Sequence, residues 1–123
     1  MIKFNRLRIS NDATAKLKVL KTRTGLTPNI LCRLALCFSL ENEKPNNLIP
    51  MDENGQEFNK HTLLGEDDAH YVSLVKQRCL EDGLDPEKEF LNQMRLHINH
   101  GVTILSGRIK SIGEVTNLLK GRL

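Results

Sequence analysis

The side chains best suited to chemistry in this sequence are three cysteines and four histidines. A thiolate activated by a histidine can act as a nucleophile, but such partners meet in space, and no spacing here selects a pair. Cys32, Cys37 and Cys79 form no C-x-x-C pair, and their apolar neighbours are typical of buried thiols. His97 and His100 could share a helix face, but the sequence places no further metal ligand beside them. We therefore predict no catalytic and no metal-binding residues.

Other sequence motifs of catalysis are missing as well. The chain contains no G-x-G-x-x-G, G-x-x-x-x-G-K-[ST], H-E-x-x-H or G-x-S-x-G. The consecutive carboxylates Glu66, Asp67 and Asp68 could bind a divalent cation, but they are better explained as acids that complement the dipole of a helix start. We expect a protein that is not an enzyme and needs no cofactor.

Positive charge is concentrated in the first 40 residues. Eight lysines and arginines stand there against the single acid Asp12, whereas residues 41–95 carry six basic residues against thirteen acidic ones. Charge separated in this way suggests an anionic partner for the N-terminal third. The alternative is that the lysines are only the solvated face of a helix.

The first element expected from the pattern is a short strand. Polar and apolar residues alternate from Arg6 to Ser10, which is the period of a half-buried strand. Leu7 and Ile9 would share one side. The other side would carry Arg6, Arg8 and Ser10.

A pair of helices should follow. The first begins near Asn11 or Asp12 and ends at Thr24-Gly25, where a glycine can adopt a positive φ. Thr27-Pro28 starts the second, because a capping hydroxyl is followed by a proline that needs no hydrogen-bond acceptor. The expected buried residues are Ala13, Leu17 and Leu20 in the first helix, and Ile30, Leu31, Leu34, Ala35 and Phe38 in the second.

The rest of the chain predicts a loop and three further helices. Residues 41–62 are polar and rich in turn formers, so we expect an ordered loop with a mobile tip and a brief extended segment at 55–58. Helices should run from Gly65 to about Asp82, from Asp85-Pro86 to Gly101, and from Ser111 onward. Residues 102–105 could be a strand or a helical turn.

Length and composition predict a mainly α single domain over residues 1–123. It would comprise a basic strand-helix-helix unit (1–40), the loop (41–62) and a helical remainder (63–123). The start lacks a signal peptide's apolar segment and no apolar run is long enough to cross a membrane, so we expect a cytoplasmic protein without membrane contact.

The N-terminal unit resembles the ribbon-helix-helix unit of small DNA-binding repressors. The residues that carry the resemblance are the strand, the two helices and the turn Arg23-Thr24-Gly25-Leu26-Thr27. In that family strands from two chains pair and lie in the major groove. The resemblance implies that Arg6, Arg8 and Ser10 face base edges. It also implies that amides near Thr27 to Asn29, after Gly25, take a phosphate.

Nearly the full chain is similar to the DndE family, small components of the bacterial DNA phosphorothioation system. The matching segments follow in order: the turn Arg23–Thr27, Gly55-Gln56-Glu57-Phe58, Thr62-Leu63-Leu64-Gly65-Glu66, Lys76-Gln77-Arg78, Leu84-Asp85-Pro86 and His100-Gly101-Val102. The resemblance implies a system that replaces a non-bridging phosphate oxygen of DNA by sulfur. A cysteine desulfurase, an adenylating or sulfur-transferring protein and an ATPase would supply the reactions, and this member would hold DNA and self-associate.

We therefore predict a non-catalytic subunit that binds the phosphate backbone of double-stranded DNA. It would form a homo-oligomer, a tetramer or dimer, contact other proteins of the sulfur modification complex, and prefer nicked or distorted DNA. The expected contacts are Lys16, Lys18, Lys21 and Arg23, then Arg6, Arg8 and Arg33, with Gly25, Thr27 and Asn29 at the turn. The alternatives are a sequence-specific ribbon-helix-helix repressor and a sulfur-handling enzyme or carrier that uses Cys32, Cys37 or Cys79.

Overall fold

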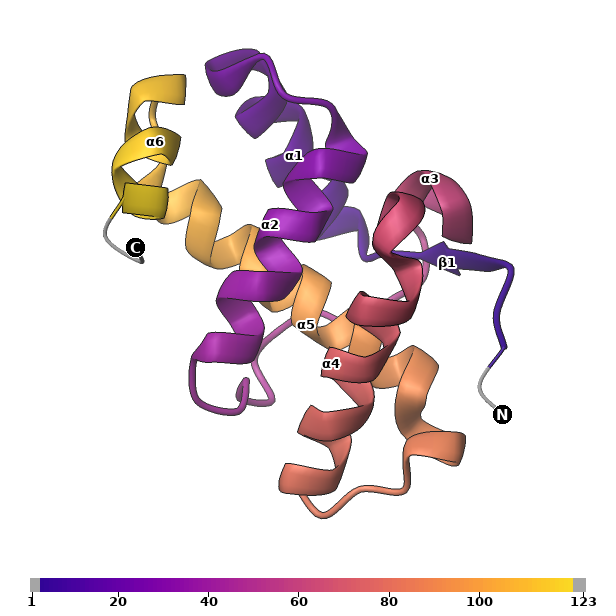
Figure 1. Ribbon diagram of the computed structural model, residues 1–123. Coiled ribbons are helices and arrows are strands. Elements are labelled where there is room, and N and C mark those ends of the chain that lie inside the picture. Colours follow the sequence, from indigo (N-terminus) through magenta and orange to yellow (C-terminus); the bar gives the residue numbers. More distant parts are fainter. Residues whose placement is uncertain (1–2, 121–123) are drawn as a thin grey trace.

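The computed structural model describes residues 3–120, which form the mainly helical fold that the sequence predicts (Figure 1). The elements are β1 (Arg6–Arg8), α1 (Asn11–Thr24), α2 (Pro28–Glu41), β2 (Glu57–Asn59), α3 (Lys60–Leu64), the 3-10 helix η1 (Gly65–Asp67), α4 (Asp68–Glu81), α5 (Pro86–Arg108) and α6 (Ile112–Lys120). No helix among the described residues is long and apolar enough to cross a membrane.

The long helix α5 is the centre of the packing, and α1, α2 and α4 all contact it. Figure 1 shows α5 crossing behind α2, with α4 beside its first half and α1 beside its second half. One continuous buried cluster joins these elements. Its largest fully buried members include Leu17 and Leu20 of α1, Leu31 and Leu36 of α2, and Met94, Ile98 and Leu105 of α5. Ile30 of α2 was expected in this cluster but is 38% exposed.

Gly101 does not end a helix, as the sequence suggested, but lies inside α5. A Cβ atom at this position would overlap the backbone of Ala35 in α2, above all its carbonyl oxygen. The glycine is therefore needed where two helix backbones approach each other closely. Because α5 continues to Arg108, residues 102–105 are helical, and Val102 and Leu105 are fully buried.

The strand β1 pairs antiparallel with β2 of the same chain, with Leu7 opposite Phe58. Leu7 and Ile9 are buried, as predicted. Ser10 is also buried, so its predicted outward position is wrong. Its Oγ accepts a hydrogen bond from the Ala13 amide at 3.0 Å, which makes Ser10 the cap of α1 in place of Asn11 or Asp12.

The segment predicted as loop and helix start at 41–67 contains more structure than expected. The brief extended segment is β2, which begins two residues and ends one residue later than predicted, and α3 follows it directly. Gly65, at φ +68°, closes α3, and η1 carries Glu66 and Asp67 to the start of α4 at Asp68. The predicted third helix therefore begins at Gly65 as the 3-10 helix η1 and becomes α-helical only at Asp68, and α3 is an additional helix before it.

Candidate nucleic-acid interface

The outer face of α1 carries Lys18 and Lys21. The two residues are three apart on a helix, so their side chains lie on neighbouring turns of one surface, and both are exposed. Within residues 3–120 neither side chain has an ion-pair partner. Both ammonium groups are therefore free to approach an anion.

Lys16 lies at the edge of this face, next to α5. Its Nζ atom is 2.7 Å from Asp12 Oδ2, one helical turn earlier, and 3.4 Å from Thr103 Oγ1 of α5. The ion pair is partly exposed, so it contributes little to stability. Lys16 can exchange Asp12 for another anion at small cost.

Arg23, predicted as a main contact, points toward the end of α5 instead. One guanidinium nitrogen donates to the carbonyl oxygens of Ser106 and Ile109, both at 3.4 Å. The last carbonyls of a helix lack partners within the helix and carry partial negative charge. Arg23 therefore serves first to stabilise the C-terminus of α5.

Arg33 has a similar role at the end of α3. Its Nε donates to the Leu63 carbonyl at 2.8 Å, and a terminal nitrogen donates to the Thr62 carbonyl at 3.0 Å. A Cβ atom at Gly65 would lie 2.9 Å from the same guanidinium group. The close approach of Arg33 to this turn explains both its half-buried position and the glycine.

The arginines of β1 face solvent but share an acidic neighbour. Arg6 and Arg8 lie 3.6 and 3.7 Å from the carboxylate of Glu57 on β2. The outer edge of β1 is covered in part, because Arg95 of α5 donates from Nε to the Arg8 carbonyl at 2.8 Å. The strand is thus paired within the chain on one edge and bonded to α5 on the other.

The turn between α1 and α2 has the predicted geometry. Gly25 adopts φ +76° and donates its N–H to the Lys21 carbonyl at 2.8 Å. Thr27 occupies the cap position of α2, with no hydrogen bond from its side chain, and the first turn of α2 contains no acid. Asn29 lines a cavity of about 360 Å³ together with Gln56 and Thr62. These residues are not on the outer face of α1.

A second polar region was not predicted, and it lies where α2 ends against α5. Ser39 Oγ is 2.7 Å from His97 Nδ1 and 2.9 Å from His100 Nδ1. Burial, followed by the charge of Arg78, lowers the pKa of His97 to about 4, and the same two causes lower the pKa of His100. Sequence spacing placed the histidines on one face but gave no sign of Ser39.

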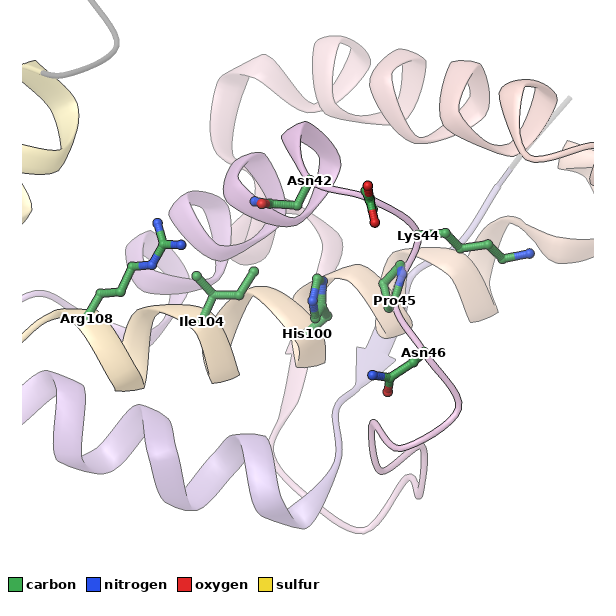
Figure 2. Close-up of a pocket in the computed structure, with 8 residues that line it drawn as sticks. Asn42, Lys44, Pro45, Asn46, His100, Ile104 and Arg108 are labelled. Atoms are coloured by element: carbon green, nitrogen blue, oxygen red, sulfur yellow. The ribbon is translucent and has the colours of Figure 1, made fainter.

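His100 also lines a cavity of about 630 Å³ (Figure 2). The wall consists of Asn42, Glu43, Lys44, Pro45, Asn46, His100, Ile104 and Arg108. Figure 2 shows His100, Ile104 and Arg108 in a row along α5, opposite the segment that carries Pro45 and Asn46. The polar donors of this wall come from α5, which carries His100 and Arg108, and from the loop after α2, for which the sequence predicted no role.

Two of the three cysteines, Cys32 and Cys79, are poorly placed for reaction. Burial raises the pKa of the Cys32 and Cys79 thiols, so both are held in the unreactive protonated form at neutral pH. Cys37 is partly buried. No group of three or more histidine, cysteine, aspartate or glutamate side chains within residues 3–120 is arranged to hold a metal ion.

Comparison with known proteins gives a consistent result. A sequence model of the family described as DNA sulphur modification protein DndE matches residues 6–112. The chain is similar to the crystal structure of DndE from Escherichia coli B7A, with a TM-score of 0.69 and 30% identity over 85% of this chain and 98% of that one. It is also similar to a glycine-to-lysine mutant of DndE, with a TM-score of 0.68 and 28% identity over 85% and 99%. No curated protein matches the chain.

Proposed function

The chain belongs to the DndE family of DNA sulphur modification proteins, and we propose that it is a non-catalytic subunit that holds DNA by its phosphate backbone. The similar structure from Escherichia coli is described as involved in DNA phosphorothioation modification. Within such a system, a protein with buried Cys32 and Cys79 thiols, and with no metal-binding group within residues 3–120, is suited to binding rather than to chemistry. The reacting groups would come from its partner proteins.

The observation that carries the DNA part of this proposal is the outer face of α1. Lys18 and Lys21 are exposed on one helical surface, without ion-pair partners among the described residues. A lysine is a flexible point charge that binds phosphate without reading a base. We therefore assign these two lysines as the principal contacts, with Lys16 beside them.

The remaining candidates are assigned secondary roles. Arg23 and Arg33 already donate to helix carbonyls, so a phosphate would have to compete with the chain itself. Arg6 and Arg8 share Glu57, which weakens their attraction for an anion and argues against reading bases. Gly25 and Thr27 shape the turn that follows the lysines, and Asn29 faces the smaller cavity.

The salt dependence of DNA binding tests the assignment directly. Each lysine that contacts a phosphate releases about one counterion, so Lys18→Ala and Lys21→Ala should each reduce the slope of log K against log salt by about 0.9. Lys88→Ala is the matched control, because Lys88 is exposed in the first turns of α5, at the opposite end of the molecule from α1 (Figure 1). Equal slopes for all three variants would refute the assignment.

Competition experiments test what the protein recognises in DNA. A backbone binder should bind unrelated duplexes with similar affinity, whereas a repressor should prefer one operator by on the order of 1,000-fold. We also propose a preference for nicked or distorted duplex, because replacing a single phosphate oxygen requires access to a backbone that an intact helix restrains. Comparison of intact and nicked duplexes of one sequence measures that preference.

Self-association is part of the same proposal. Val19 of α1 and Ile30 of α2 are apolar but 44% and 38% exposed. A contact between copies would bury them and bring several lysine faces onto one DNA, in a dimer or tetramer that acts in the cytoplasm with the other modification proteins. Light scattering should show a smaller particle for Ile30→Ser than for the control Leu48→Ser, since Leu48 is an 85% exposed loop residue.

A further inference from the structure

Ser39 bridges two histidines. Its hydroxyl carries one hydrogen, and its Oγ has only the two Nδ1 atoms of His97 and His100 as partners within the described part of the chain. The hydroxyl therefore donates to one ring and accepts an N–H from the other. A neutral imidazole carries its hydrogen on one nitrogen only, so the two rings are opposite tautomers.

The burial of His97 indicates which of the two rings donates a hydrogen bond to Ser39 and which accepts one. His97 Nε2 is buried without a hydrogen-bond partner within residues 3–120. An unpaired N–H is rarer in protein interiors than an unpaired acceptor. His97 therefore carries its hydrogen on Nδ1 and donates to Ser39. The Ser39 hydroxyl then donates to His100 Nδ1, so His100 carries its hydrogen on Nε2.

This arrangement presents an N–H donor to the larger cavity. His100 lines the cavity, its Nδ1 is turned to Ser39, and its Nε2 is neither buried nor bonded within the described residues. Arg108 lies two helical turns further along the same face of α5 (Figure 2). Lys44 lies on the facing loop, but its ammonium group points away from His100 and Arg108 (Figure 2). The amides of Asn42 and Asn46 are the remaining donors of the wall.

We propose that the cavity between the end of α2, the following loop and α5 is a binding site for a phosphate group, held by His100 Nε2–H and Arg108, with the side-chain amides of Asn42 and Asn46 as further donors. Two cations stand against the single carboxylate Glu43, and the neutral donors complement oxygen rather than a metal. A cavity of about 630 Å³ is the size of a small-molecule site. It therefore has room for a phosphate that is part of a nucleotide or of a DNA end.

The proposed site is independent of the DNA face on α1. Its residues come from α5 and from the loop after α2, whereas Lys18 and Lys21 are on the outer face of α1. Binding of inorganic phosphate can be measured in the absence of DNA. A failure here would leave the backbone-binding proposal intact, and a failure of backbone binding would leave this one intact.

The first experiment is a titration of the full chain with inorganic phosphate, followed by ¹H–¹⁵N NMR. We expect saturable shifts in the side-chain amides of Asn42 and Asn46 and in the His100 ring. Arg108→Gln should weaken binding by about tenfold, the usual effect of one charge-assisted hydrogen bond. Lys110→Gln, which removes an exposed charge just beyond α5, is the control and should leave the affinity unchanged. The absence of saturable shifts, or equal losses in both variants, overturns the proposal.

Two further variants test the chemistry of the wall. Glu43→Gln removes its only carboxylate and should tighten phosphate binding, whereas unchanged or weaker binding contradicts an anion site. Ser39→Ala tests the positioning role through the ¹⁵N shifts of the imidazoles. In the wild type His100 should be protonated on Nε2, and the variant should mix both tautomers and bind phosphate about threefold more weakly. A wild-type His100 protonated on Nδ1 would overturn the donor assignment.

The source of the phosphate is decided by three probes: inorganic phosphate, adenosine monophosphate, and a duplex with or without a 5′-phosphate. Preference for the mononucleotide identifies a nucleotide site. A gain in affinity from the 5′-phosphate that disappears in Arg108→Gln identifies a DNA-end site. Either result supports the proposal, and no dependence on Arg108 with any probe excludes it.

Discussion

The basic residues of this protein work in two different regions. In the contacts between elements, Arg23, Arg33, Arg78 and Arg95 donate to backbone carbonyls of other elements. On the outer face of α1, Lys18 and Lys21 have no such partners among the described residues. A guanidinium has five donors in a fixed fork and binds carbonyls well, whereas an ammonium on a flexible stem stays hydrated. The total number of basic residues is therefore larger than the number of basic side chains that are available to bind an anion.

The buried region should tolerate change least, and Gly101 gives the largest expected effect. Gly101→Ala would force its Cβ into the Ala35 carbonyl and separate α2 from α5, so we expect a loss of more than about 3 kcal/mol in the free energy of unfolding. The control is Gly107→Ala in the same helix, where a Cβ meets nothing within 4 Å. That variant should gain up to about 1 kcal/mol from better helix propensity. Urea denaturation of both measures the difference, and similar values would contradict the close approach.

The histidine pair should make stability depend on pH. The folded-state pKa of His97 is about 4, below its unfolded value of 6.5, so the unfolded chain binds a proton that the folded chain excludes. Stability is therefore fully retained above pH 6.5 and is lost as the pH falls toward 4, by up to about 3 kcal/mol. His97→Gln should flatten this dependence, whereas His61→Gln, at an exposed site, should not. Denaturation at pH 7 and pH 5 provides the test.

Arg95 tests whether a buried arginine has a role in DNA binding. Its guanidinium bonds the Arg8 carbonyl, Asn92 Oδ1 and Glu53 Oε1, and the residue is 4% exposed. Arg95→Met leaves the partly buried Arg8 carbonyl without its donor and should cost about 2 kcal/mol of stability. The salt slope of DNA binding should not change, because the charge never reaches the surface. A reduced slope would place Arg95 with the lysines.

Sequence patterns predicted the local features of the fold and failed where distant segments meet. The alternation at Leu7 and Ile9 and the signals Thr24-Gly25 and Thr27-Pro28 depend on neighbouring residues, and the structure shows all of them. Gly101 was misread because the helix that requires a glycine there is distant in sequence.

The candidate site shows the same limit. The exposure of Lys18 and Lys21 follows from helical periodicity, so the sequence could indicate it. The carbonyl partners of Arg23 and Arg33 lie on other helices, so no local sequence pattern could predict them. Ser39 meets His97 and His100 only because α2 crosses α5. Its role could not be read from a single serine in an apolar helix.

The arginines of β1 share features with both groups of basic residues: they are exposed like the lysines of α1 but paired like the arginines between elements. A change at Glu57 tests whether they can contribute to DNA binding. Arg6 and Arg8 are exposed like the lysines, yet both lie within 4 Å of the Glu57 carboxylate. Such exposed pairs contribute at most about 1 kcal/mol, so Glu57→Gln should hardly change stability. If the strand faces DNA, the variant should bind about two- to threefold more tightly at low salt, because two charges are released and screening is weak. Glu81→Gln, at an exposed carboxylate at the end of α4, is the control for net charge. Equal gains in both variants would place the strand outside the DNA interface and leave α1 as the contact surface.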